Sequence, residues 1–253
     1  MRLFSRLSLL VTVLLLLLAP AAAWCKDPDL LFDEGHGQRF VMEKEGDLEL
    51  STLAKVFTDA GFTPAPTREP LNDVTLAHAR ALVISGLFTP LSPQEVASIG
   101  RFLERGGRLA IMLHIGQPVA ELLHSLNVDV SNYVLSEQEN IIGDDPKNFR
   151  VTRFVNHPLT AGLDHFSLHG GWALMNLDDS ARIVASTSPR AWVDLDGNRK
   201  LSPGDVVQSF GVVVAGTRGN GRFAVFGDDA IFQNRFMDEA NRQLALDLAS
   251  WLH

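Results

Sequence analysis

Short apolar runs alternate with stretches of helical spacing through the first half of the chain. The apolar runs 30–33, 81–86 and 108–114 contain few polar residues, as is typical of strands covered on both faces. Apolar residues recur at helical spacing over three further segments, residues 48–60, 92–106 and 119–126. Strands that alternate with helices in this way predict a parallel sheet with helices on both faces.

The second of these helices carries its own start and stop signals. Ser92 is a typical N-cap residue, Pro93 suits the first helical position, and Glu95 completes a capping box. The pair Gly106 and Gly107 then ends the helix, because glycine adopts the backbone conformation that closes a helix. These signals indicate a helix whose N-terminus follows the strand at 81–86.

The pattern changes in the second half of the chain, where apolar runs are shorter and helical spacing is weak. We predict strands there, some of them antiparallel, at residues 150–155, 172–174, 181–185, 191–193 and 208–214. A tight hairpin at 219–221, a core strand at 221–228 and a helix at 241–252 complete the chain. We therefore expect one α/β domain over residues 28–253. Its sheet would be doubly wound, flavodoxin-like or Rossmann-like and mainly parallel, with an antiparallel β-rich insertion over about 149–214.

The first residues read as a secretory signal peptide. Arg2 and Arg6 precede a leucine-rich run over 7–18, and small residues follow over 19–23. The run is shorter than the roughly 20 residues that a membrane-spanning helix needs. We predict a signal peptide over 1–23 and export to the periplasm or the extracellular space. The alternative is an uncleaved anchor, which would make this segment the protein's only membrane contact.

Charge and cysteine content narrow the classes of partner. The formal net charge is −8, and removal of Arg2 and Arg6 with the signal peptide brings it to about −10. An acidic chain without a basic stripe repels phosphate backbones, so nucleic acid is excluded as a partner. Cys25 is the only cysteine in the sequence, so no internal disulfide can form. A chain of this length can bury a core without one.

Several short segments, in a fixed order, resemble one family of domains. They are residues 32–37, the strand at 84–86 with its capped helix and the glycines 106–107, and residues 219–222, 227–232, 241 and 251–252. The chain resembles the uncharacterised domains related to class I glutamine amidotransferases. Such domains also occur in gliding-motility transport auxiliaries and in intraflagellar transport proteins. The resemblance covers most of the chain after the signal peptide and implies an amidotransferase-like α/β domain.

The catalytic groups of that family are missing from this sequence. Class I amidotransferases use a cysteine at the turn after a central strand, activated by a histidine. The matching strand, 109–114, is not followed by cysteine, and Cys25 lies at the end of the signal segment. A His-x-Glu pair is also absent, since Leu159 stands two residues after His157. The resemblance therefore implies a domain without glutaminase activity that binds or assembles at the cell envelope, with an envelope protein or a small ligand as partner.

Polar residues at the carboxyl ends of the predicted parallel strands form the candidate ligand-binding set, because ligands of open α/β sheets bind there. The set is Asp33, Glu34, His36, Ser85, His114, Asp228 and Asp229. An alternative is a metal-dependent hydrolase that uses four of them, Asp33, His36, His114 and Asp228, as ligands or as acid and base. A further alternative is a solute- or glycan-binding module that works beside a transporter. The same carboxylates also suit simple capping of turns and helices.

A separate segment, residues 194–205, follows the twelve-residue pattern of a calcium-binding loop. The candidate ligands are Asp194, Asp196, Asn198, the backbone carbonyl of Lys200, and Asp205. Two residues depart from the pattern: Arg199 replaces a glycine, and Asp205 replaces the usual glutamate. The flanks read as strands, so the alternative is a polar hairpin with Asp-Gly-Asn turn chemistry. Calcium, if bound, would be structural, and no other cofactor is expected.

Overall fold

The computed structural model describes residues 27–253. The signal peptide predicted over 1–23 and Cys25 lie outside the described residues. Within 27–253, no helix combines the length and the apolar character that crossing a membrane requires.

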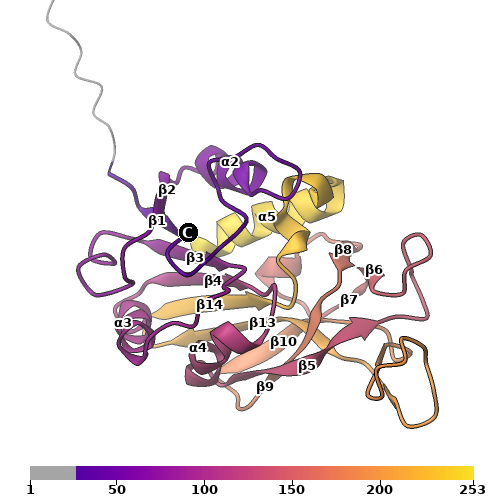
Figure 1. The fold of residues 1–253 in the computed structure, drawn as a ribbon. Helices are drawn as coiled ribbons and strands as arrows, with labels where there is room; N and C mark the ends of the chain where they lie inside the picture. Colours follow the sequence, from indigo (N-terminus) through magenta and orange to yellow (C-terminus); the bar gives the residue numbers. More distant parts are fainter. Residues whose placement is uncertain (1–26) are drawn as a thin grey trace, which may run out of the picture.

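Five parallel strands form one side of a large sheet (Figure 1). Their spatial order is β2 (Pro64–Thr67), β1 (Leu30–Asp33), β3 (Ala81–Ser85), β4 (Arg108–Met112) and β14 (Gly221–Phe226). Each neighbouring pair is in parallel register. The carboxyl ends of all five strands therefore lie along the same edge of the sheet, where the candidate ligand-binding residues follow them.

The sheet continues beyond β14 with antiparallel strands. The hairpin of β13 (Gly211–Arg218) and β14 makes the transition, and Arg218 pairs with Gly221 at its tip, as predicted for residues 219–221. The other strands of the sheet are β5 (Val128–Ser136), β7 (Arg153–Phe154), β9 (Trp172–Asn176), β10 (Ala181–Ser186), β11 (Trp192–Val193) and β12 (Val206–Val207). A separate two-stranded sheet pairs β6 (Asn148–Val151) with β8 (Phe166–His169). The fold is thus mixed α/β with a sheet of 12 strands, parallel on one side and antiparallel elsewhere.

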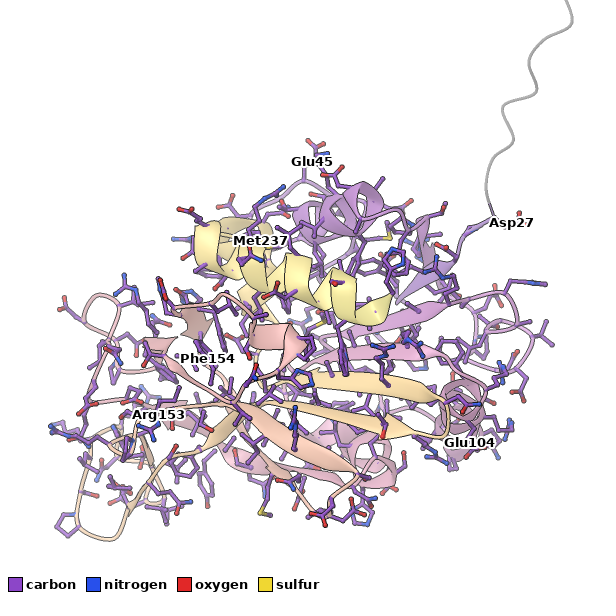
Figure 2. All side chains as sticks on the ribbon, turned by 180° about the vertical axis from the view of Figure 1, so that it is seen from behind. Asp27, Glu45, Glu104, Arg153, Phe154 and Met237 are labelled. Carbon is purple, nitrogen blue, oxygen red and sulfur yellow. The ribbon has the colours of Figure 1, made fainter. Side chains whose placement is uncertain are left out.

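Helices cover both faces of the parallel strands (Figure 1). On one face, α2 (Ser51–Asp59) and α5 (Glu239–Leu252) pack against alternate residues such as Val83 and Ala110. On the other face, α3 (Pro93–Glu104) and α4 (Ala120–Ser125) pack against the strand residues that point the opposite way, such as Ile84 of β3. Figure 2 shows α5 lying across the strands when the molecule is seen from behind. Short 3-10 turns occur at Gln117–Val119, Pro158–Thr160, Ala230–Phe232 and Asn234–Phe236.

The secondary structure confirms much of the predicted order and corrects its second half. The capping box of α3 is present, since Ser92 accepts the Glu95 N–H and Glu95 accepts the Ser92 N–H. Antiparallel pairing begins with β5 at Val128, earlier than the predicted insertion at about 149. The single strand predicted over 150–155 is two strands, β6 and β7, which belong to different sheets.

Candidate functional site

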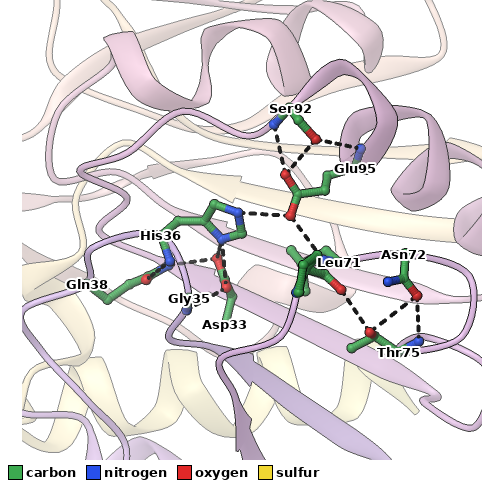
Figure 3. A network of polar contacts seen from close by, with 10 residues as sticks. Asp33, Gly35, His36, Gln38, Leu71, Asn72, Thr75, Ser92 and Glu95 are labelled. Carbon is green, nitrogen blue, oxygen red and sulfur yellow. Dashed lines mark hydrogen bonds and ion pairs between the residues drawn. The ribbon is translucent and has the colours of Figure 1, made fainter.

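His36 lies between two carboxylates at the carboxyl edge of the parallel strands (Figure 3). Its Nδ1 lies 2.9 Å from both carboxylate oxygens of Asp33, and its Nε2 lies 3.0 Å from Oε1 of Glu95. His36 is buried, with an exposed fraction of 7%. The hydrogen bond to Asp33, aided by the negative charges of Asp33 and Glu95, raises the pKa of His36 despite its burial. Both ring nitrogens are therefore occupied, and His36 joins the loop after β1 to the start of α3.

The two carboxylates around His36 are also saturated with other donors. The side-chain amide of Gln38 donates to Asp33 at 2.7 Å, and the Gly35 N–H donates to it at 3.1 Å. Glu95 accepts the Leu71 N–H on one oxygen and both donors of Ser92 on the other (Figure 3). These hydrogen bonds and the charge of His36 outweigh burial and lower the pKa of Glu95. Asp33 and His36 thus hold the edge together and present no free ligand atom pair.

Glu34, the next candidate along the chain, is also engaged. Its oxygens accept the Met42 N–H at 3.1 Å and the Arg68 guanidinium at 2.6 Å. Arg68 is solvent-exposed, whereas the Glu34 side chain is buried. Glu34 therefore anchors the loop after β1.

His114, which follows β4, is the one predicted histidine with an open side. Its Nδ1 lies 3.1 Å from Oδ1 of Asp229, and 37% of its side chain is exposed. The rings of Phe40 and Phe88 contact it, with centroids 5.5 Å and 5.1 Å away. The hydrogen bond to Asp229 raises the pKa of His114 although burial opposes it. Within residues 27–253, Nε2 of His114 has no hydrogen-bond partner.

Asp228 and Asp229, which follow β14, are adjacent buried carboxyl groups. The oxygens of Asp228 accept the His169 N–H at 2.6 Å and the Ala230 N–H at 2.9 Å. Burial, with the charge of Asp229, raises the pKa of Asp228 to about 8. Burial likewise raises the pKa of Asp229, and its Oδ2 has no hydrogen-bond partner among the described residues.

The tight space around Asp229 explains a glycine at the end of β3. Gly86 has φ +61°, a conformation that favours glycine. A Cβ added there would lie 2.7 Å from Oδ2 of Asp229. Ser85, the candidate just before it, is buried, and its hydroxyl makes no hydrogen bond within the described part of the chain. Gly86 therefore allows Asp229 to lie behind His114.

The predicted metal site of Asp33, His36, His114 and Asp228 is not formed. The part of the chain that the structure describes has one group of three or more His, Cys, Asp or Glu side chains with ligand atoms within 4.8 Å of one another, and it consists of Asp194, Asp196 and Asp205. The four candidates divide instead into the His36 cluster and the His114 cluster, because each histidine pairs with a different carboxylate. This corrects the shared metal site on which the hydrolase hypothesis depended.

The loop 194–205 joins β11 and β12, which pair directly as antiparallel strands, as the flanks predicted. Arg199, at the position of the pattern's glycine, has φ +64° and so adopts the left-handed turn that the pattern requires. Asp194 accepts the N–H groups of Gly197 and Arg199, and Asn198 accepts that of Lys200. Backbone N–H groups of Leu195 and Ser202 bind Asp205 and lower its pKa. The loop is thus folded on its own carboxylates, three of which converge.

A pocket of about 620 Å³ adjoins this loop. Its lining includes the rings of Tyr133, Trp172 and Trp192 together with charged residues of both signs, Asp194 and Arg199 among them. The indole N–H of Trp172, one of the lining residues, donates to the backbone carbonyl of His114 at 3.0 Å. Rings beside polar groups suit a small polar ligand.

A family model described as "Domain of unknown function (DUF4350)" matches residues 50–249, which is most of the chain. The chain belongs to the DUF4350 family. No curated protein matches it in sequence.

Several solved structures share the fold of this chain at low sequence identity. The mmIFT52 N-terminal domain has a TM-score of 0.71 and 17% identity, covering 88% of this chain and 96% of that one. The cytoplasmic protein STM1381 from Salmonella typhimurium LT2 has a TM-score of 0.58 and 15% identity, covering 88% and 98%. A putative ThuA-like protein from Bacteroides uniformis has a TM-score of 0.51 and 15% identity, covering 92% and 94%. At such identities the likeness shows the fold alone.

Sequence reasoning missed several residues of the site, among them Gln38, Phe40, Phe88 and the second role of Glu95. Glu95 was recognised only as part of a capping box, although one of its oxygens also binds His36. Phe88, which packs on His114, lies in a turn without a periodic pattern. One signal could have placed Glu95 in the candidate site: it lies at the start of a helix that follows a parallel strand, and such helix starts lie at the carboxyl edge of the sheet.

Proposed function

We propose that this DUF4350 protein is an exported, non-catalytic binding domain of the cell envelope, related to the amidotransferase-like domains and built on a flavodoxin-like sheet. The parallel strand order β2-β1-β3-β4-β14 supports the flavodoxin-like relation, because it corresponds to the order 2-1-3-4-5 of that fold. Export rests on the signal-peptide pattern of residues 1–23.

The observation that carries the proposal is the state of the polar residues at the carboxyl edge. His114 follows β4, where an amidotransferase would place its cysteine, and the only cysteine of the sequence is Cys25. His36 is bonded at both ring nitrogens, and Asp228 accepts two backbone N–H groups. Groups used in this way stabilise a surface rather than exchange protons with a substrate.

The binding region would be the open side of His114 together with the adjoining pocket. Phe88 and Phe40 flank the His114 ring, and Arg39 lies over Phe88 with its guanidinium carbon 4.5 Å from the ring centroid. The pocket behind Trp172 adds further rings and charged groups of both signs. An envelope protein or a small polar ligand could contact both parts, because Trp172 joins them.

A structural calcium ion in the loop 194–205 is part of the proposal. The proposal is supported by the converging carboxylates of Asp194, Asp196 and Asp205 and by the positive φ of Arg199, which the glycine of the pattern would also adopt. Asn198 and the Lys200 carbonyl would complete the ligand set. Binding would order the hairpin that lines the pocket, because Asp194 and Arg199 belong to both.

A second candidate function, a hydrolase, is favoured by the pair of His114 and Asp229. A carboxylate on Nδ1 with Nε2 open is the arrangement of a general base and the group that orients it. No Ser, Thr or Cys side chain among residues 27–253 is hydrogen-bonded to this nitrogen, so any such reaction would activate water.

The binding proposal is tested by site-specific photocrosslinking in the native envelope. The probe replaces Tyr133 in the pocket, and the matched control replaces Leu246 on α5, with similar exposed fractions of 43% and 39%. We expect a discrete crosslinked species from position 133 only, reduced by His114→Ala in the same chain. Equal crosslinking from both positions, or none from position 133, would contradict the proposal.

A further inference from the structure

Arginines gather at the amino edge of the parallel strands, opposite the His114 cluster. Arg108 begins β4 and pairs in register with Arg222 of β14 on one side. On its other side it pairs with Ala81 of β3, which Arg80 directly precedes. Parallel pairing in register places the side chains of Arg108 and Arg222 on the same face of the sheet, the face covered by α5. This concentration of positive charge is unusual in a chain of net charge −8.

A pocket of about 320 Å³ opens beside Arg80 and Arg108, and Arg222 is not part of its lining. Arg80, Arg105 and Arg108 line it, together with the turn at Gly106 and Gly107 and the last residues of the chain. Glu104, the last residue of α3, marks this side of the molecule in Figure 2. The pocket is therefore separate from the binding region proposed above, which lies beyond the opposite ends of the same strands.

The positive charges around the pocket are only partly balanced. Arg80 pairs with Asp29 at 3.0 Å, and Arg105 pairs with Asp73 at 3.4 Å. Asp73 is shared, because it pairs more closely with Arg101, at 2.6 Å.

Arg108 and Arg222 have no ion pair with any described carboxylate. Arg222 instead lies over the Trp251 ring, with its guanidinium carbon 4.7 Å from the ring centroid. Two guanidinium charges at this edge consequently lack a counter-ion within residues 27–253.

Arg108 also has unused hydrogen-bond donors. Its Nη1 donates to the carbonyls of Gly106 and Asn220. Its Nε is buried and has no acceptor, and its Nη2 makes no hydrogen bond in the described part of the chain. Nε and Nη2 form the side of the guanidinium that holds two oxygens of one anion. Burial, followed by the charges of Arg222 and Arg80, lowers the pKa of Arg108, which is the direction that a bound anion would reverse.

We propose that this pocket binds a phosphate group, carried by a small phosphate monoester or by a lipid headgroup. Arg108 lines the pocket without an ion pair to any described carboxylate, and its unused Nε and Nη2 donors match two oxygens of a phosphate. Arg80 and Arg105 stand at the pocket wall to contact the remaining oxygens. The competing explanation is that the arginines only stabilise the C-terminal end of α5, where a helix carries partial negative charge.

The test uses inorganic phosphate and the purified protein, with binding followed by ³¹P NMR line width and by calorimetry at constant ionic strength. We expect saturable binding that Arg108→Gln weakens roughly ten- to a hundredfold, the loss expected for a charge-assisted bidentate contact. Arg108→Lys should also bind more weakly than the natural protein, because lysine keeps the charge but lacks the two parallel donors. Arg153→Gln, an exposed arginine on β7, is the matched control and should bind as the natural protein does.

Two further probes separate the sources of the phosphate. Glycerol 3-phosphate represents a soluble monoester, and phosphatidylcholine vesicles with and without phosphatidic acid represent a lipid headgroup. Binding to either probe that depends on Arg108 supports the site and names its source. The proposal is wrong if none of the three probes binds saturably, or if Arg108→Gln and Arg108→Lys bind as Arg153→Gln does. The arginines would then only stabilise the C-terminal end of α5. NMR line widths report binding even where a variant is less stable, provided its amide spectrum remains folded.

Discussion

Replacing His36 with alanine should destabilise the protein while leaving its fold intact. The substitution removes the one group that donates to both Asp33 and Glu95. Loss of one partner from a buried ion pair costs about 3–5 kcal/mol when the other partner is left uncompensated. Asp33 keeps the donors of Gln38 and Gly35, and Glu95 keeps those of Ser92 and Leu71. We therefore expect a loss of about 2–4 kcal/mol in the free energy of unfolding.

The loss should depend on pH in a direction that the pKa shift of His36 determines. The folded-state pKa of His36 is raised above the unfolded value of 6.5. The stability that its charge contributes is thus fully present below about 6.5 and is lost as the pH rises through the folded-state pKa. The pKa of Glu95 is lowered, so its contribution is lost only at acid pH, as the pH falls through its folded-state value. The difference between the natural protein and His36→Ala should therefore be larger at about pH 6 than at about pH 9.

Urea unfolding at the two pH values measures this difference. A loss of about 3 kcal/mol corresponds to a midpoint shift of roughly 1 M urea in a chain of this size. His78→Ala is the matched control, because His78 is exposed and makes no hydrogen bond within the described residues, so its free energy of unfolding should change by less than about 0.5 kcal/mol. If His36→Ala behaves like this control at both pH values, the two-carboxylate contact is not a stabilising feature of the protein.

Three other substitutions or treatments test the remaining parts of the structure. Gly86→Ala should lower the free energy of unfolding by about 1–3 kcal/mol, because the new Cβ would displace Asp229. Displacement of Asp229 should also lower the pKa of His114 in an NMR titration, and an unchanged His114 titration would contradict the contact. The raised pKa of the buried Asp228 should make the natural protein less stable as the pH rises from 3.8, the unfolded pKa, to about 8, the folded pKa. Asp228→Asn should flatten this decline in stability, and an unaltered pH profile would show that Asp228 does not titrate there. Saturating calcium should raise the melting temperature by about 5 °C relative to chelator. Asp196→Asn should abolish this rise and Glu45→Gln should not, and equal melting temperatures with and without calcium would contradict calcium binding by the loop.

The parallel half of the fold was predictable because its strands and helices differ sharply in period. The apolar runs that became β1, β3 and β4 and the capping signals at Ser92 and Glu95 are local features. The edge strand β2 was missed, since its sequence Pro64-Ala65-Pro66-Thr67 contains two prolines, which cannot donate to a sheet. Only its position at the edge, with one neighbour, makes that composition tolerable.

The antiparallel half was less predictable because its strands are partly exposed. β5 carries polar residues such as Asp129 and Asn132, and its pairing with β9 contains an irregularity, so its apolar period is weak. The candidate site was found as a set of residues but not as two clusters. His36 and Glu95 are 59 residues apart, and His114 and Asp229 are 115 apart, so only the parallel register brings each pair together.

The most direct test of a binding role without catalysis is the release of ammonia from glutamine by the purified protein. Heat-denatured protein and His114→Ala serve as references. Since the turn after β4 carries His114 in place of a cysteine, the natural protein should release no more ammonia than either reference. Release that His114→Ala abolishes, accompanied by a covalent glutamyl intermediate in the mass spectrum, would contradict the proposed function.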